Sequence, residues 1–234
     1  MDGEAKKGAN GLSEGETAGT DGAAAAWKLR QGLSRLPESQ SESQSRGDHD
    51  LNPGMGRAPA LIPAAVLVPV FDSGADIDVL FTKRAIDLTD HAGEISFPGG
   101  RIEPADGDAA AAALRETEEE LGLPSHQIEI IGALDLYETR TGFLVTPLVG
   151  LVAPPLILRP DPREVAEVIR VPLGHLLNRL NYRSEEREAG GKLRRFYSLA
   201  FGDYVIWGAT AGMLVNLCER MARHGTAHHG MEHQ

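Results

Sequence analysis

Three glutamates occupy positions that an α-helix would bring onto one face. Glu116, Glu119 and Glu120 stand at i, i+3 and i+4, and residues at these spacings are neighbours on a helix surface. Carboxylate oxygens suit Mg²⁺ and Mn²⁺, which keep waters and substrate phosphate oxygens among their ligands. The spacing therefore predicts a divalent-cation site capable of phosphate chemistry.

The charge balance around these glutamates distinguishes such a site from an acidic, solvated helix surface, which is the usual meaning of a charge run. No lysine or arginine follows the three acids in the predicted helix at the spacing that would neutralise them. The nearest cation, Arg115, precedes them and is placed to pair with Glu119 and orient it. This imbalance favours the cation site.

A glycine pair lies upstream of the glutamates, in the stretch 96–101, SFPGGR. Glycine has no Cβ, so the backbone at Gly100 can approach a metal ion or a phosphate closely. No Gly-Lys-Ser or Gly-Lys-Thr follows at the spacing of a phosphate-binding P-loop. A plain turn is the alternative use of such a pair, and the acidic helix that follows favours the first use.

The glutamates fall within a stretch that carries clear helix signals. Residues 109–113 are strong helix formers, and Asp106 or Asp108 is placed to cap the start. Gly122 ends the pattern. The stripe that would face the core consists of Leu114, Thr117 and Leu121. We therefore predict a helix over about 108–121.

Apolar runs on both sides of this helix are typical of β-strands. We predict strands at Ile62–Val70, Ile77–Lys83, Ile128–Leu136 and Phe143–Val152. The first two flank a turn at 72–74 and form a hairpin-like pair, and a second helix is predicted over about 204–223. These elements indicate an α+β fold in which a mixed β-sheet is sandwiched between α-helices.

The composition of the chain changes at both ends. Residues 1–58 are rich in small and polar residues, which predicts a disordered N-terminal segment. Within it, residues 23–36 show near-helical apolar spacing that would suit a short docking helix. We predict one folded domain over 59–223, followed by a mobile, histidine-containing tail over 224–234.

The overall composition excludes several classes of protein. A formal net charge of -11 argues against general nucleic-acid binding, and the single cysteine, Cys218, excludes an intrachain disulfide. No apolar run is long enough for a transmembrane helix, and no signal peptide begins the chain. We expect a cytoplasmic protein with a small-molecule substrate and no nucleic-acid or membrane partner, and a homodimer stays open.

Gly100 and the stretch 115–123, RETEEELGL, resemble the Nudix box. That box is a glycine, a spaced acid, and then Arg-Glu-aliphatic-x-Glu-Glu-x-Gly-aliphatic. The interval after Gly100 is longer by one residue, so either Glu103 or Asp106 takes the place of the first acid, and Thr117 replaces an aliphatic residue. Neither departure touches the three glutamates, and the chain is identified as a member of the Nudix superfamily.

Further stretches are similar to the coenzyme A diphosphatase branch of that superfamily. They are residues 80–85 (LFTKRA), Gly93, residues 97–100 (FPGG) and residues 206–211 (IWGATA). Thr89 stands where the branch has an arginine, and Phe81 stands where it has a leucine. The missing cation bears on how the 3′-phosphate of coenzyme A would be held.

The resemblance implies a Nudix fold and a metal-dependent hydrolase. The implied reaction converts coenzyme A or acyl-coenzyme A to 3′,5′-ADP and 4′-phosphopantetheine or its acyl form. Another nucleoside diphosphate derivative, such as ADP-ribose, is an alternative substrate that Thr89 keeps open. A non-enzymatic Nudix-fold binding module is a third reading, which the intact carboxylates disfavour.

The resemblance also assigns roles to individual residues. Glu116, Glu119 and Glu120 would bind Mg²⁺ or Mn²⁺ together with the carbonyl of Gly100. Arg115 would orient the glutamates. Glu116 is our first choice as general base, although the family varies in this role.

Four further charged residues are candidates for positions near the site. Arg84 and Arg101 are candidates for substrate phosphate contacts, because a guanidinium offers a bidentate fork. A plain surface position is the alternative for both. Glu164 and Glu167 lie in an acid-bearing stretch that could approach the site, although as surface residues of a strand edge they need no function.

Overall fold

A computed structural model describes residues 28–33, 45–55, 60–74, 76–87, 91–189 and 191–229 of the chain. The centre of its main sheet consists of β2 (Ile62–Asp72), β3 (Ile77–Arg84), β8 (Phe143–Val152) and β9 (Val165–Pro172). β2 pairs in parallel with β8 and antiparallel with β3, and β9 pairs antiparallel with β3. The sheet is therefore mixed, as the sequence predicts.

Shorter strands complete this sheet, and a second sheet stands beside it. The added strands are β1 (Arg46–Gly47) on β7, β4 (Ile95–Ser96) on β3, β5 (Gly99–Arg101) on β2, and both β6 (Ile128–Ala133) and β7 (Tyr137–Glu138) on β8. The second sheet consists of β10 (Tyr182–Ala189), β11 (Lys192–Phe201) and β12 (Tyr204–Trp207), all antiparallel. Three short 3-10 turns are described: η1 (Asp48–Asp50), η2 (Ser125–Gln127) and η3 (Arg179–Asn181).

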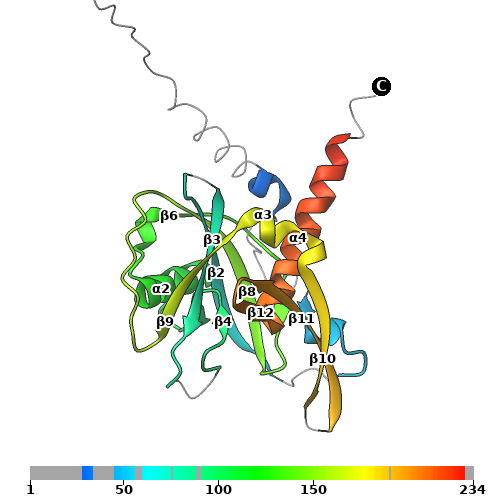
Figure 1. Cartoon of the computed structure of the whole chain (residues 1–234). Helices are drawn as coiled ribbons and strands as arrows, with labels where there is room; N and C mark the ends of the chain where they lie inside the picture. The colour runs from blue at the N-terminus through cyan, green and yellow to red at the C-terminus, as the bar shows by residue number, and fades with distance from the viewer. Residues whose placement is uncertain are drawn as a thin grey trace, which may run out of the picture.

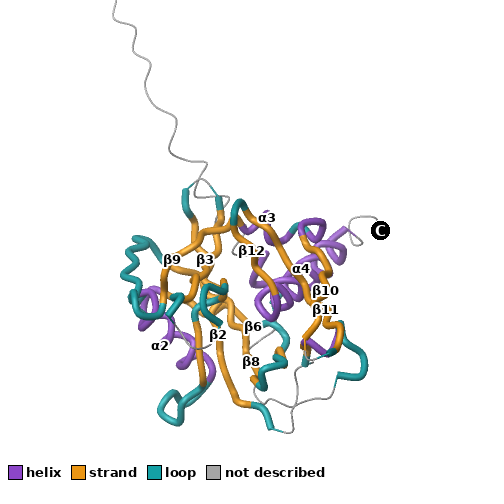
Figure 2. Tube along the Cα trace, turned by 60° about the horizontal axis from the view of Figure 1, so that its bottom comes forward, coloured by secondary structure: helices purple, strands orange, loops and turns teal. Residues whose placement is uncertain are grey.

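Two helices cover opposite faces of the main sheet, and Figure 1 shows them on its two sides. Alternate side chains of β2 point to each face. Ala65 and Leu67 pack in one cluster with α2 (Ala109–Leu121), whereas Ala64 and Val68 pack in another with α4 (Gly208–His229). The short helix α3 (Leu173–Leu177) follows β9 in the chain and lies beside α4 (Figure 2). The predicted α+β sandwich is confirmed.

Two predicted elements end or begin elsewhere. β6 stops at Ala133, before the predicted end at 136, because the Asp135 N–H donates to Asn216 Oδ1 of α4 at 3.0 Å. Residues 204–207, predicted as the start of the last helix, form β12 instead. Gly208, the first residue of α4, has a φ of 64° and turns the chain from that strand into the helix.

Parts of the N-terminal segment are folded onto the domain. Residues 28–32 are helical, Leu29 is buried in the core cluster of α4, and Arg30 donates to both carboxylate oxygens of Glu129 at 2.7 Å. This helix lies where the sequence suggested a docking helix. Residues 45–55 are also folded, whereas the rest of 1–58 lies outside the described residues.

The C-terminal helix runs further than the sequence suggests. α4 extends to His229, into the segment for which we predicted a mobile tail, and residues 230–234 lie outside the described part of the chain. Neither α4 nor any other described helix is long and apolar enough to span a membrane.

Candidate active site

The glutamates are carried by α2, whose ends are fixed by hydrogen bonds. Asp108 caps the start, where its Oδ1 accepts a backbone N–H of the first turn at 2.7 Å. Gly122 ends the helix at φ 64°, with its N–H bonded to the Glu118 carbonyl. Thr117 is fully buried and donates its hydroxyl to the Ala113 carbonyl at 2.7 Å. The threonine is therefore accommodated at an apolar position.

The glycine pair lies in β5, a strand paired with β2, and not in a plain turn. A Cβ added to Gly100 would lie 2.5 Å from Glu116 Oε1. A Cβ added to Gly99, whose φ is 152°, would lie 2.4 Å from the Ala65 carbonyl oxygen. Side chains at these positions would separate β5 from α2 and from β2, so the glycines allow the Glu116 carboxylate to lie against the backbone.

The three glutamates of α2 reach different depths. The Glu119 side chain is 56 % exposed, Glu116 is partly buried, and Glu120 is 4 % exposed. Glu120 Oε1 accepts the Gly99 N–H at 3.3 Å. No three acidic, histidine or cysteine side chains among the described residues are grouped as a metal site. The glutamates thus form a row from solvent toward the sheet, and their joint ligation of a metal stays a prediction.

Arg115 connects the acids of the site. Its Nε and Nη2 donate to both carboxylate oxygens of Asp106, at 2.7 and 3.1 Å. Its Nη1 donates to Glu116 at 2.9 Å and to Glu119 at 3.1 Å. Asp106, and not Glu103, is thus the acid that contacts Arg115, and Arg115 lowers the pKa of Asp106. The predicted orienting role of Arg115 agrees with these contacts.

Burial raises the pKa of two of the glutamates, Glu116 and Glu120. Desolvation raises the pKa of Glu120 to about 7, and the Gly99 N–H and the charge of Arg84 offset only part of this. Desolvation also raises the pKa of Glu116, against the opposing effect of Arg115. A bound cation would stabilise both carboxylates.

Two residues from other elements contribute charge to this row. Arg84, at the end of β3, acts on Glu120, and its Nε is buried with no hydrogen-bond partner in the described structure. The Ala85 N–H donates to the Glu164 carbonyl at 2.8 Å, and the charge of Glu164 raises the pKa of Glu116 and Glu120. The Glu164 side chain is exposed, as the surface interpretation expected, and a backbone bond between distant segments brings its charge near this row.

The loop that carries Glu164 is also bonded to the end of α2. The Arg159 N–H donates to the Leu121 carbonyl at 2.7 Å, and the Asp161 N–H donates to the Glu120 carbonyl at 3.0 Å. The loop is therefore tied to α2 at one end and, through Glu164, to β3 at the other.

Two residues considered from the sequence point elsewhere. The Arg101 guanidinium lies 5.6 Å from the centre of the Phe143 ring. Glu167 lies 3.7 Å from Lys83 Nζ and accepts the hydroxyl of Tyr204. Neither side chain contacts the glutamates of α2, so Arg101 supports the site only through its carbonyl, which accepts from Arg115 at 3.2 Å.

Comparison with known proteins identifies the family of this chain. Residues 61–190 match the family described as NUDIX domain. The chain belongs to the Nudix family. An uncharacterized Nudix hydrolase NudL of Photorhabdus laumondii subsp. laumondii is 37 % identical over 158 residues, which are 68 % of this chain and 84 % of that protein. The NudL of Escherichia coli (strain K12) is 38 % identical over 154 residues, covering 66 % and 80 %.

Solved structures also align with this chain. The MutT protein from Methanosarcina mazei Go1 aligns with a TM-score of 0.46 at 18 % identity, covering 73 % of this chain and 99 % of that chain. The family makes this chain a Nudix hydrolase, an enzyme that acts on phosphorus-containing anhydrides. Nudix hydrolases generally use divalent metal ions.

The residues of this Nudix site suit such an ion. Glu116, Glu119 and Glu120 supply hard oxygen donors, and the absent side chain of Gly100 leaves its backbone beside Glu116. The raised pKa of Glu120 marks a carboxylate whose ionised form lacks sufficient stabilisation within the protein alone. The unbonded Nε of Arg84 is a donor suited to a phosphate oxygen.

Proposed function

We propose that this Nudix hydrolase cleaves the diphosphate bond of coenzyme A or acyl-coenzyme A in the cytoplasm. The products would be 3′,5′-ADP and 4′-phosphopantetheine or its acyl form. The observation that carries the hydrolytic reaction is the packing of Glu116 against Gly100 and of Glu120 against Gly99. The stretches that resemble the coenzyme A branch support the substrate.

Those stretches are neighbours in the fold. Residues 80–85 end β3, residues 97–100 lead into β5, and residues 206–211 run from β12 into α4. β12 lies beside β4, which connects β3 to the glycine strand. This proximity supports our inference that the less buried residues of the three segments contribute to one substrate surface.

We assign the metal ligands as Glu116, Glu119, Glu120 and the Gly100 carbonyl, with Mg²⁺ or Mn²⁺ as the ion. When bound, the ion neutralises charge on the phosphoryl oxygens and on the leaving group. Arg115 holds Glu116 and Glu119 in place through the contacts described above.

The chemical step is an attack of water on one phosphorus of the diphosphate. A bond forms between the water oxygen and phosphorus, the bond from phosphorus to the bridging oxygen breaks, and the water proton passes to Glu116. Arg84 would hold a phosphate oxygen through its buried guanidinium, and Arg101 is a weaker candidate because its side chain lies on Phe143.

A second candidate substrate is another nucleoside diphosphate derivative, such as ADP-ribose. Thr89 favours it, because a threonine replaces the arginine that the coenzyme A branch has at this position. Thr89 itself lies outside the described residues. A non-catalytic binding module is disfavoured because all three glutamates and Arg115 are present.

The test is to incubate the purified protein with coenzyme A and Mg²⁺ or Mn²⁺ and to identify the products by chromatography. Glu119→Gln should abolish turnover, whereas Glu118→Gln, which removes the same charge from an exposed position of α2, should retain it. Cleavage of ADP-ribose with coenzyme A left intact would overturn the assignment of coenzyme A as the substrate. No metal-dependent cleavage of either would overturn the enzyme reading, and sedimentation of the same sample tests whether the enzyme is a homodimer.

A further inference from the structure

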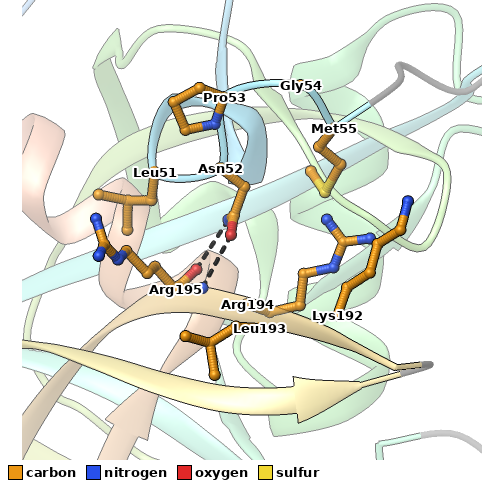
Figure 3. Close-up of a pocket in the computed structure, with 9 residues that line it drawn as sticks. All are labelled: Leu51, Asn52, Pro53, Gly54, Met55, Lys192, Leu193, Arg194 and Arg195. Carbon is orange, nitrogen blue, oxygen red and sulfur yellow. Dashed lines mark hydrogen bonds between the residues drawn. The ribbon is translucent and has the colours of Figure 1, made fainter.

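A second charged feature lies away from α2, where the segment after η1 meets the edge of β11 (Figures 1 and 3). A groove of about 460 Å³ runs between residues 51–55 and residues 192–195. Asn52 joins its two sides, because its side-chain amide accepts the Arg195 N–H at 2.9 Å and donates to the Arg195 carbonyl at 3.0 Å. The size falls within the range of about 300–1,000 Å³ for small-molecule sites.

Two cations on one side of the groove have no acidic partner within the described structure. Lys192 and Arg194 are two residues apart on β11, so their side chains project to the same face. Figure 3 shows both on the side of Met55, whereas Arg195 lies on the side of Leu51. Only Arg195 of the three is paired, with its Nε 2.6 Å from Glu186.

The pairing of β10 with β11 adds a further positive charge. Arg194 lies directly opposite Arg187, and like charges in directly opposed positions destabilise a strand pair. Arg187 is held over the ring of Trp207, 6.0 Å from its centre, and not by an acid. This concentration of positive charge stands out in a chain with a net charge of -11. An anion bound at Arg194 would relieve the repulsion.

We propose that this groove binds a phosphate-bearing small molecule of nucleotide size. A terminal phosphate carries a charge of about -1.5 to -2 at neutral pH, which matches the two unpaired cations, Lys192 and Arg194. Their Cα atoms are about 7 Å apart along the strand, so both side chains reach one phosphate, and the guanidinium offers a two-pronged contact. Leu51 and Met55 supply apolar surface for the organic part of the ligand. The site is separate from the α2 carboxylates and does not depend on the proposed substrate.

The test is calorimetric titration of the full chain with ADP in the presence of EDTA, which removes the divalent ions that the α2 site needs. We expect binding of one ADP to the groove, with Arg194→Gln and Lys192→Gln each weakening it at least 10-fold. Arg183→Gln, which removes the same charge from an exposed position of β10, should bind like the wild type. Glu119→Gln should also bind like the wild type.

Each other outcome overturns the assignment. Undiminished binding in both groove variants, or no binding in the wild type, would show that the groove is not a phosphate site. Loss of binding in Glu119→Gln would place ADP at α2. Binding of an acidic decapeptide with the same dependence on Arg194, in place of ADP, would make the groove a peptide site. Thermal melting of each variant establishes that a loss of binding is not a loss of folding.

Discussion

Asp135 and Glu120 are both buried carboxylates, but the chain surrounds them differently. Asp135 lies beneath α4, where Asn216 Nδ2 donates to it at 2.7 Å and Arg220 contacts it, while Arg46 Nε of β1 approaches to 3.6 Å. A buried charge that is paired and hydrogen-bonded in this way contributes to a specific fold, and removal of its charge leaves the partners uncompensated.

Glu120 has no comparable set of partners. It is 4 % exposed, receives one backbone N–H from Gly99 at 3.3 Å, and is influenced at longer range by the charge of Arg84. Its pKa of about 7 reflects this shortage. Asp135, which is buried with partners, stabilises the fold. Glu120, which is buried with few partners, needs a bound cation to stabilise its ionised form.

The largest expected effect is on the free energy of unfolding, and it distinguishes Asp135 from Glu120. Asp135→Asn should lower the free energy of unfolding by about 3–5 kcal/mol, because Arg46 and Arg220 would lose the buried anion between them. The turnover of the remaining folded enzyme should be unchanged. Denaturant unfolding measures this, with the exposed Asp203→Asn as control. A loss below about 1 kcal/mol would show that the charge of Asp135 does not stabilise the fold in this way.

The converse substitution should act on catalysis. Glu120→Gln should lower kcat about 100- to 1,000-fold, because it removes a charge that helps to hold the metal ion. In EDTA its free energy of unfolding should equal or exceed that of the wild type, since a poorly compensated buried charge is gone. Steady-state kinetics and denaturant unfolding of the same preparation measure both effects. A stable variant with full activity would show that Glu120 has no part in the reaction.

The pH dependence of stability should follow Glu120 as well. Its pKa is raised from 4.5 to about 7 in the folded protein. Between these values the unfolded chain has released a proton that the folded chain still holds, so stability falls as the pH rises. The metal-free enzyme should lose up to about 3 kcal/mol between pH 4.5 and pH 8. Unfolding curves in EDTA should show a smaller slope for Glu120→Gln than for the wild type.

The smallest expected effect concerns the arginine that joins the acids. Arg115→Gln should lower kcat about 10- to 100-fold, because Glu116 and Glu119 lose their orientation while keeping their charge. Asp106→Asn should act in the same direction, and the double variant should lose less than the sum of the two effects. Additive losses in this double-mutant cycle would mean that Asp106 acts on the site by another route.

Local signals in the sequence were enough to locate α2 and its acids. The cap at Asp108 and the stop at Gly122 act within one helix turn, and both are confirmed. The depth of each glutamate was not predictable in this way. The spacing suggested one shared surface, but the packing of α2 on β2 and β5 buries Glu120 and leaves Glu119 exposed.

Several features of the structure depend on distant partners, and local patterns in the sequence either missed them or left them open. Residues 204–207 form a strand because β11 lies beside them, and Leu29 is buried because α4 provides the surface. Glu164 joins the site through a backbone bond to Ala85. Composition and periodicity describe short stretches of the chain, so they do not predict contacts between residues that are far apart in the sequence.

The loop tied to α2 at Asp161 and to β3 at Glu164 works as a spacer of set length. One residue inserted between these two bonds would preserve every charged group of the site and yet shift Glu164 relative to Glu120. The number of residues between Asp161 and Glu164 therefore sets where the charge of Glu164 lies relative to Glu120. A redesign that exchanges this loop should keep that number of residues.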